Sequence, residues 1–311
     1  MNKRLNWFRG QKWGIFVHYL YHEQNNPLQA VNMGRGQTDW NECVEEFDTD
    51  VFAAQVASTG AGYVFFTVMQ GTKFLCAPNA AYDRITGSAA GEACSKRDLI
   101  GDLIQSLSKH GVALFLYYTG DGPHKDPVCG PKMGYSDQKT KVNEPFVRNW
   151  ASVAREYSMR YGKNINGWWV DGCYESFGYN DELLSVYAEA MRAGNPDTLL
   201  AFNGGIGRRI FKYSANDDYT CGEMNHLYDL PDSRLIEGCQ WHTLAPVGIS
   251  PNGEEWGAWC KPGCRYSNEF LNWYVGKCNE KGGIVTFDVC LYRDGHIDPM
   301  QTEQLKTVGG R

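Results

Sequence analysis

The sequence lacks any long hydrophobic run. No part of its 311 residues approaches the roughly 18 to 20 uninterrupted apolar residues of a membrane-spanning helix, and the opening MNKRLNWFRGQKWG has no apolar signal core. These absences exclude a membrane span and predict a soluble protein with no membrane partner. They leave the natural compartment open.

Basic clusters and histidines are also scarce. The formal net charge is -6 and no run of lysine or arginine stands out, so the surface offers little to a phosphate backbone. Only seven histidines are present, and no two lie at metal-ligand spacing on one expected element. We therefore expect no nucleic-acid partner, no metal and no cofactor, and a metal-dependent hydrolase has little support.

Cysteine, in contrast, is abundant. The odd number, eleven, leaves at least one cysteine without an internal partner. Several fall on or beside apolar segments, where a thiol behaves as a small hydrophobe, and we expect reduced core residues at Cys173, Cys221, Cys239 and Cys290. Cys260 and Cys264 could form a short disulfide or hold a metal, but a single C-x3-C is a weak zinc signal.

Apolar segments of strand length alternate with helical segments along the chain. With 42% hydrophobic and 14% aromatic residues, one domain over residues 1–311 accounts for the length. The expected strands are 14–19, 63–68, 113–119, 167–172, 199–204, 218–223, 238–244 and 283–289. The expected helices are 48–59, 98–110, 145–161, 181–193 and 267–281.

This alternation predicts a parallel sheet, and eight such strands predict a (β/α)8 barrel of the TIM type. Too few residues separate 204 from 218 and 223 from 238 for full helices, so we expect a barrel distorted around strands five to seven. Long loops at 20–46, 120–143 and 245–266 follow expected strands, which places them at the carboxyl-terminal face, where substrates bind.

Asp171 ends the apolar, aromatic segment GWWVDG. A strand this apolar is buried on both faces, so its last residue lies where a parallel sheet meets its loops. Asp171 could cap a helix or pair with an arginine, but the tryptophans before it and the glycine after it favour a desolvated acid beside a stackable surface. The sequence therefore predicts a functional acid at this position.

Other polar residues end the remaining strands and should converge on the same pocket. They are His18, Met69 and Gln70, Tyr117 and Tyr118 with Asp121 beyond, Asn203, Glu223, His242 and Asp288. Two acids on different strands suit glycoside hydrolysis, in which one is ionised and the other protonated. Aromatic rings would stack on a sugar and raise a carboxyl pKa; the candidates are Trp40, Tyr117, Tyr118, Trp168, Trp169 and Trp241.

Each polar candidate also has a structural alternative. His18 could simply hydrogen-bond a neighbouring loop, and Glu223 could pair with Arg208 or Arg209. His242 could bind a metal with His18 and the strand-end acid, which the spacing neither supports nor excludes.

Several ordered blocks of the sequence resemble one enzyme family. WFRGQKWGIFVHYLY is similar to WFR..K.GIF.HWG.Y, KRDLIGDLIQSLSKHGVALFLYYT to RDL...L....R..G...G.YYS, and RYGKNINGWWVDG to a strand ending W.DG. Trp40 and the segment EEFDTDVFAAQVASTGAGYVFFT resemble a tryptophan-bearing loop and an AGA.Y...T strand. KGGIVTFDVCLYRDGHIDP is fainter and looks like GGN.LLN..P..DG. Together these blocks resemble the α-L-fucosidases of glycoside hydrolase family 29.

The resemblance implies a retaining exo-glycosidase that acts on α-L-fucose or a related pyranose. Asp171 would be the nucleophile, because it occupies the acid of W.DG, and Glu223 in YTCGE would be the acid/base, aligned with a T.PE-like segment. Glu254 and Glu255 in the long loop are reserve candidates for the second role. The side chains expected at the sugar are His18, Trp40, Gln70, Tyr118, Trp169, Asn203 and His242.

The chain also departs from the family. The paired histidines of KHHDGF, which hold fucose hydroxyls, are replaced in the segment Met69–Phe74, and an arginine after the fifth strand is replaced by Gly204 and Gly205. Losing these donors should change which sugar is accepted. No β-sandwich is expected after the barrel.

These departures motivate an alternative function, a carbohydrate-binding barrel that has lost catalysis. In either case we expect an oligosaccharide or glycoconjugate ligand, whereas the oligomeric state is open. The resemblance points to periplasmic, secreted or lysosomal relatives and favours a periplasmic or secreted protein, although reduced core cysteines are also compatible with a cytoplasm.

Overall fold

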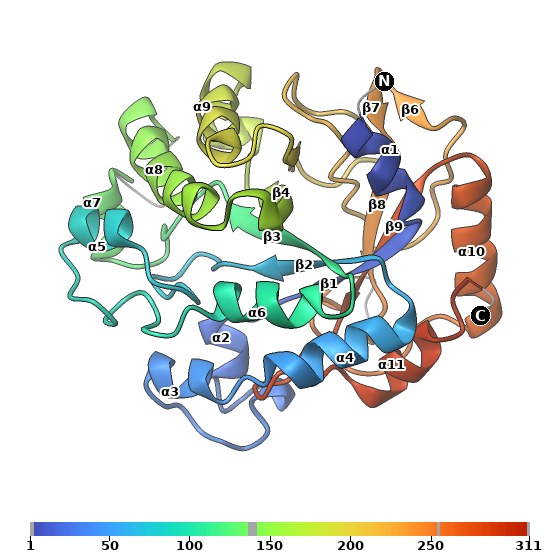
Figure 1. The fold of residues 1–311 in the computed structure, drawn as a ribbon, viewed down its shortest axis with the longest axis horizontal. Helices are drawn as coiled ribbons and strands as arrows, with labels where there is room; N and C mark the ends of the chain where they lie inside the picture. Colours follow the sequence, from blue (N-terminus) through green and yellow to red (C-terminus); the bar gives the residue numbers. More distant parts are fainter. Residues whose placement is uncertain (1–2, 136–141, 254–255, 310–311) are drawn as a thin grey trace.

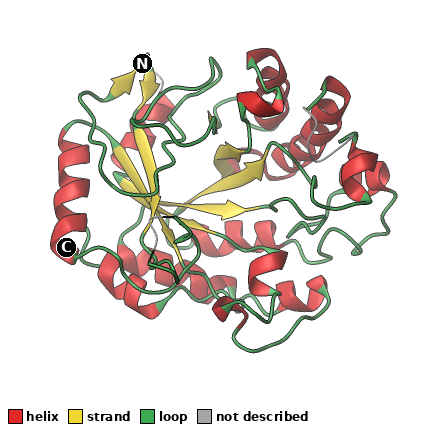
Figure 2. Cartoon of the chain, turned by 180° about the vertical axis from the view of Figure 1, so that it is seen from behind, coloured by secondary structure: helices red, strands yellow, loops and turns green. Residues whose placement is uncertain are grey.

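The computed structural model describes residues 3–135, 142–253 and 256–309 and shows a parallel sheet surrounded by helices (Figure 1, Figure 2). Seven parallel strands form one curled sheet in the order β5-β4-β3-β2-β1-β9-β8. Their bounds are β1 Trp13–Val17, β2 Tyr63–Thr67, β3 Ala113–Thr119, β4 Ile165–Asp171, β5 Leu199–Phe202, β8 His242–Pro246 and β9 Ile284–Val289. The chain is therefore a mixed α/β fold whose sheet forms a half-barrel.

The helices that cover the outer face of the sheet lie where the sequence predicted them. They are α4 Thr49–Thr59, α6 Leu99–Ser108, α8 Glu144–Tyr161, α9 Asp181–Arg192 and α10 Asn268–Glu280, followed by α11 Pro299–Leu305. Each begins after a side chain that accepts a hydrogen bond from a first-turn N–H: Asp48, Asp98, Asn143, Asn180, Ser267 and Asp298. These N-caps satisfy otherwise unpaired donors and fix where each helix starts.

Shorter elements complete the described chain. They are α1 Lys3–Gly10, α2 Tyr21–Gln24, η1 Ala30–Asn32, α3 Trp40–Glu45, α5 Ala80–Thr86, α7 Cys129–Met133, η2 Gly162–Asn164, η3 Glu175–Phe177, and the antiparallel pair β6 Leu235–Ile236 and β7 Cys239–Gln240. Phe8 of α1 closes the amino-terminal end of the sheet, because its ring lies 5.0 Å from Tyr63 and 5.1 Å from both Phe115 and Tyr219. Phe8 does not cover the opposite end of the sheet, where the strands reach their carboxyl termini.

The expected (β/α)8 barrel is confirmed only in part, because the sixth expected strand is irregular. Residues 218–223 lie beside β8 through two isolated parallel bridges, Tyr219 with Gln240 and Glu223 with Leu244. Gly222 allows this approach: its φ is +62° and a Cβ would lie 2.0 Å from the His242 carbonyl. The segment is thus held against β8 without forming a named strand.

On the side that faces β5, the carboxylate side chains of Asp217 and Asp218 accept backbone N–H groups that a regular neighbouring strand would bind with its carbonyl groups. Asp217 Oδ1 accepts the Phe202 N–H at 2.8 Å, and Asp218 Oδ2 accepts the Leu200 N–H at 3.0 Å. Burial raises the pKa of Asp217 to about 7. Carboxylates therefore take the place of the carbonyl groups that a regular strand would offer to β5.

The seventh expected strand, 238–244, is also different from its prediction. Its first part belongs to β7, which pairs with β6, and β8 begins only at His242. As predicted, no helix follows β5 or the 218–223 segment in the described part of the chain before α10. The barrel is therefore distorted where the sequence indicated.

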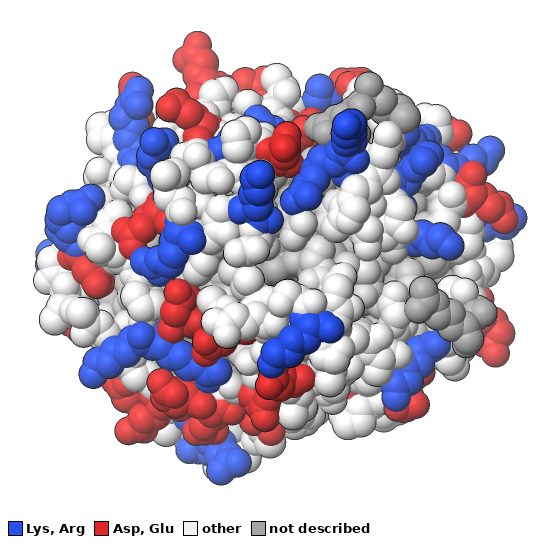
Figure 3. Space-filling model, in the orientation of Figure 1, with Lys and Arg blue, Asp and Glu red and all other residues white. Residues whose placement is uncertain are grey.

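All eleven cysteines are free, and ten of them are buried. This confirms the expectation of reduced core thiols, and the disulfide alternative for Cys260 and Cys264 is wrong. No helix among the described residues has both the length and the apolarity needed to cross a membrane. On the face drawn in Figure 3, Lys and Arg side chains are interspersed with Asp and Glu.

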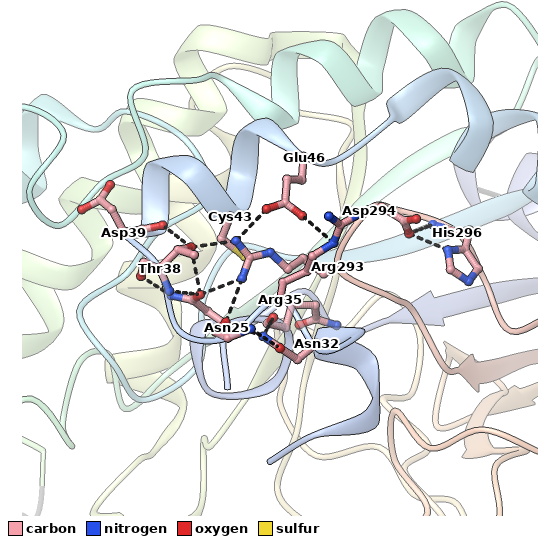
Figure 4. A network of polar contacts seen from close by, with 12 residues as sticks. Asn25, Asn32, Arg35, Thr38, Asp39, Cys43, Glu46, Arg293, Asp294 and His296 are labelled. Atoms are coloured by element: carbon pink, nitrogen blue, oxygen red, sulfur yellow. Dashed lines mark hydrogen bonds and ion pairs between the residues drawn. The ribbon is translucent and has the colours of Figure 1, made fainter. Parts of the chain in front are cut away.

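A buried arginine fixes the long loop between β1 and α4. Arg293, which follows β9, is 0% exposed, and its guanidinium binds four groups of that loop (Figure 4). Its Nη1 donates to Asn25 Oδ1 at 3.0 Å and to the Gly36 carbonyl at 3.2 Å. Its Nη2 donates to Thr38 Oγ1 at 2.7 Å and to Glu46 Oε1 at 2.8 Å. The loop is thereby tied to the end of β9.

Replacing Arg293 with methionine is expected to lower the free energy of unfolding by about 3–5 kcal/mol, because several acceptors and Glu46 lose their buried partner. Arg35 offers a matched control: its side chain is 57% exposed, and its Nε lies 3.8 Å from the other oxygen of Glu46. Arg35→Met should therefore cost less than about 1 kcal/mol. Equilibrium unfolding in urea measures both changes, and equal losses would contradict the assigned role of the buried arginine.

Candidate active site

A cavity opens at the carboxyl-terminal ends of the strands. It has a volume of about 220 Å³ and is lined by side chains from β1, β3, β4 and β8 and from the loops that follow several strands. The lining residues are Phe16, His18, Leu20, His22, Glu23, Gln70, Tyr117, Trp169, Asp171, Glu223, Leu244, Trp259 and Cys260. Six residues that were named for the site from the sequence therefore meet here: His18, Gln70, Tyr117, Trp169, Asp171 and Glu223.

Asn203 links the two predicted acids. Its Nδ2 donates to Asp171 Oδ1 at 2.9 Å and to Glu223 Oε2 at 2.6 Å. Because both oxygens lie within hydrogen-bond distance of one nitrogen, their separation cannot exceed about 5.5 Å. The sequence prediction that acids from separate strands face each other across one small space is consistent with this geometry.

A tyrosine and a glutamine complete the polar contacts of Asp171. Tyr117 Oη donates to Asp171 Oδ2 at 2.7 Å, and Gln70 Nε2 donates to Tyr117 Oη at 2.8 Å. Burial, followed by the charge of Asp171, raises the pKa of Tyr117 well above its ordinary value. Tyr117 therefore stays protonated and donates, so both oxygens of Asp171 accept a hydrogen bond.

Glu223 has a different environment from Asp171. Burial and then the neighbouring charge of Asp171 raise the pKa of Glu223 to about 7, whereas the Asn203 hydrogen bond and His18 act in the opposite direction. The alternative that Glu223 pairs with an arginine is wrong, because Arg209 binds Asp229 and Asp232 and Arg208 is exposed. Asp171 thus accepts hydrogen bonds at both of its oxygens, whereas the pKa of Glu223 is raised.

Aromatic rings form the walls of the cavity. Trp169 stacks on Tyr117 with ring centroids 5.6 Å apart, and its Nε1 donates to the Cys221 carbonyl at 3.0 Å. Trp259, on the loop after β8, lies edge-on to His18 at 6.1 Å. These faces offer the flat apolar surface that sugar rings contact.

Three residues predicted to touch the sugar lie elsewhere, and these predictions are corrected. Trp40 is the first residue of α3; its indole is buried, and its Nε1 donates to the Leu75 carbonyl at 2.8 Å. Tyr118 is 0% exposed on the outer face of β3, where it stacks on Trp150 of α8. His242 begins β8 instead of ending it, and its fully buried ring bonds to Thr220 and Thr286 below the cavity.

Three lining residues were not predicted from the sequence: His22, Glu23 and Trp259. Tyr117 and Tyr118 were both candidate rings for stacking on a sugar, and only Tyr117 lies on the inner face, because it is opposite Trp169 in the β3–β4 register, whereas Tyr118 is opposite Val170. Trp169 and Asp171 are two residues apart and share the inner face. His22 and Glu23 lie on α2, a single helical turn, and Trp259 lies on a loop; both are too short or too irregular for periodicity to carry a signal.

Several remaining expectations concern the second acid and a metal. Glu254 and Glu255, the reserve candidates, lie outside the described residues. Met69 is buried outside the cavity lining, so Gln70 is the residue of the replaced histidine pair that reaches it. Among the residues described, no group of three or more His, Cys, Asp or Glu side chains has the arrangement of a metal site.

The fold and site define a class of protein. Two carboxylates at the carboxyl end of a curled parallel sheet, joined through one amide and bordered by aromatic rings, are typical of glycoside hydrolases. A comparison with protein-family models matches the α-L-fucosidase family over residues 21–310. The chain therefore belongs to the α-L-fucosidase family, as its motifs predicted. No curated protein sequence matches the chain significantly.

Solved structures share the fold at low sequence identity. The endo-fucoidan hydrolase MfFcnA4 from glycoside hydrolase family 107 is 15% identical, with a TM-score of 0.72 over 98% of this chain and 53% of that one. A fucosyltransferase mutant of the α-L-fucosidase AlfC is 18% identical, with a TM-score of 0.64 over 99% and 97%. A GH29 α-L-fucosidase from Bacteroides thetaiotaomicron is 14% identical, with a TM-score of 0.67 over 99% and 73%. The chain thus spans about half the length of the endo-fucoidan hydrolase.

Proposed function

We propose that the protein is a retaining exo-glycoside hydrolase that releases α-L-fucose or a related pyranose, with Asp171 as nucleophile and Glu223 as acid/base. One observation carries the proposal: Asp171 and Glu223 bind the same nitrogen of Asn203. Retaining enzymes hold their carboxyl groups about 5–5.5 Å apart, whereas inverting enzymes need about 6.5–9.5 Å to admit a water between acid and sugar. The short separation supports retention.

In the first step, Glu223 gives its proton to the glycosidic oxygen while an oxygen of Asp171 attacks the anomeric carbon. The bond to the leaving group breaks, and a covalent glycosyl ester forms on Asp171. The pKa of Glu223, raised to about 7, leaves roughly half of this carboxyl protonated at pH 7 and most of it protonated at lower pH. The two donors to Asp171 keep its carboxylate aligned in the cavity.

In the second step, Glu223 is ionised and takes a proton from water, whose oxygen attacks the anomeric carbon. The ester bond breaks, the sugar leaves with its original anomeric configuration, and Asp171 regains its charge. Asn203 contacts both acids through one amide, so its hydrogen bonds redistribute as charge moves from Asp171 to Glu223. The amide therefore serves both steps.

The cavity supports exo action on a single terminal sugar. Its volume of about 220 Å³ is below the roughly 300–1,000 Å³ of most ligand pockets, which suits one ring better than an internal stretch of a polysaccharide. The Trp169 and Trp259 rings would contact the apolar face of that sugar. An AlfC structure similar to this chain contains Fuca(1,6)GlcNAc, which supports a fucosylated glycoconjugate as the substrate class.

A silent carbohydrate-binding barrel is the second candidate. It is favoured by Gln70, whose amide stands where the family motif has histidines and is bound to Tyr117. A binding barrel, however, gains nothing from two carboxylates within about 5.5 Å of each other, since their repulsion costs free energy.

The two candidates are separated by a panel of aryl glycosides of L-fucose, D- and L-galactose and L-arabinose in both anomers. The hydrolase should release the aryl alcohol from one or a few of these sugars, and calorimetry should show binding of the same sugars. Binding without any released product over long incubation would contradict hydrolysis and leave the silent barrel.

Replacing Tyr117 with phenylalanine is expected to lower kcat/KM by about 10- to 100-fold, because Asp171 loses one of its two donors in a buried site. The ring and its stacking on Trp169 remain. Tyr118→Phe is the matched control: Tyr118 Oη donates to the Trp150 carbonyl on the outer face, so its loss should affect stability and leave kcat/KM within about two-fold. Initial rates with the best aryl glycoside measure both, and equal rates for parent and Tyr117→Phe would exclude this donor role.

A further inference from the structure

Asp288 is a buried carboxylate beside the cavity that the two proposed steps do not use. It lies on β9 opposite Phe16 of β1 and Pro246 of β8, and it is 1% exposed. Its Oδ1 is 2.8 Å from His18 Nδ1, and its Oδ2 accepts the Cys260 N–H at 2.8 Å. One carboxylate therefore joins the end of β1 to the long loop after β8.

This contact determines which nitrogen of His18 carries the proton. An ionised carboxylate only accepts hydrogen bonds, so Nδ1 of His18 must be the protonated nitrogen in the pair. The ring is held in place by Phe16 at 4.8 Å and Trp259 at 6.1 Å between centroids. His18 also lines the cavity. Its Nε2 is then free to accept a hydrogen bond from a ligand.

The carboxylate of Asp288 also fixes the part of the cavity wall that contains Trp259 and Cys260. Cys260 follows Trp259, and both line the cavity. Cys260 has a φ of +55°, a backbone conformation that a non-glycine residue adopts only when its surroundings enforce it. The hydrogen bond from its N–H to Asp288 is one such constraint. Asp288 therefore acts on two parts of the site at once.

We infer that Asp288 is a positioning residue for the proposed hydrolysis: it holds His18 with Nε2 as an acceptor for a hydroxyl group of the sugar, and it anchors Trp259 through Cys260. The inference rests on the proposed function and adds a specificity element to it. The chemical class of ligand that this acceptor recognises is a sugar with a free hydroxyl at that place. A deoxy or O-methyl sugar at the same carbon would lose this hydrogen bond.

The test is a double-mutant cycle of Asp288→Asn and His18→Gln. An asparagine has one acceptor where two donors must be satisfied, so kcat/KM should fall by about 10- to 100-fold in the parent background. In the His18→Gln background the same change should cost no more than about 3-fold, because most of its effect acts through His18. Additive losses would overturn the inference.

Thr286→Val provides the matched control. Thr286 lies two residues earlier on the same face of β9 and bonds to Tyr63 and His242 below the cavity. It should lower stability while leaving kcat/KM within about two-fold, because it touches neither cavity residue. A loss of activity equal to that of Asp288→Asn would mean that β9 tolerates no change and would remove the specific role of Asp288.

A second measurement does not depend on catalysis. Nitrogen-15 NMR of the imidazole groups, assigned with His18→Gln, should show that Nδ1 of His18 carries the proton. A His18 protonated on Nε2 would overturn the inference even in an active enzyme. A protein that shows the expected tautomer but cleaves no glycoside would contradict the proposed function and leave the role of Asp288 toward His18 standing.

Discussion

Asp171→Ala should reduce kcat on an activated aryl glycoside by about 10⁴-fold or more, since no glycosyl ester can form without the nucleophile. Asn203 and Tyr117, which donate to the two oxygens of Asp171, would remain in place without an acceptor. Sugar binding should therefore survive, although weakened. Steady-state rates and calorimetry with the released sugar measure the two effects separately.

Asp197→Ala is the control for the loss of an acidic side chain. Asp197 is exposed and precedes β5, at the end of the sheet opposite the cavity, and its removal should leave kcat unchanged. Thermal unfolding of both variants confirms that the chain is folded. Undiminished turnover in folded Asp171→Ala would end the assignment of Asp171 as nucleophile.

Glu223→Gln should show a loss that depends on the leaving group. Glycosides with a poor leaving group need the proton, so their kcat/KM should fall by about 10²- to 10⁴-fold, while activated aryl glycosides should lose less in the first step. The carboxamide keeps the size of the side chain and can still accept the hydrogen bond from Asn203. A uniform loss across leaving groups would contradict the acid/base role.

The pH dependence of the activity provides a second test of the role of Glu223. The pKa of Glu223 is raised to about 7 by burial and by Asp171, so the acid is protonated below that pH and ionised above it. The first step needs the protonated form, and activity should fall as the pH rises through about 7. In Glu223→Gln this alkaline decline should disappear. Glu175→Gln, at an exposed carboxylate on the loop after β4, should keep it.

Much of the fold could be predicted because local signals agree with the tertiary structure. Asp48, Asp98 and Ser267 precede periodic apolar segments, and each caps the helix expected after it. Strands such as β1 and β3 are mostly apolar and aromatic runs, as expected for a sheet buried on both faces.

The irregular side of the sheet could not be predicted from periodicity. DYTCGE has the composition of a strand, but the side chains of Asp217 and Asp218, and not backbone carbonyl groups, accept the N–H groups of β5 at Phe202 and Leu200. The seventh strand was placed too early because GCQWHTL has the length of a single strand, and only the β6–β7 hairpin defines where β8 begins. His242 was misplaced for this reason.

The candidate site was predicted best where a residue ends a regular strand. Asp171 and Gln70 were found in this way, and Glu223 through a motif that retained its place beside β8 despite the irregular backbone. Choosing between Tyr117 and Tyr118 required the register of β3 against β4, which the sequence of one strand does not contain. The prediction that Trp40 contacts the sugar was wrong because Trp40 begins α3 and its buried indole donates to the Leu75 carbonyl.

The most direct test of the central claim is to trap the covalent intermediate. The parent protein is incubated with a 2-deoxy-2-fluoro glycosyl fluoride of the sugar that the aryl glycoside panel identifies, and the intact protein and its peptides are weighed by mass spectrometry. The account predicts one added fluorosugar on the peptide that contains Asp171. A label on another carboxylate, or an active enzyme that never acquires a label, would contradict it.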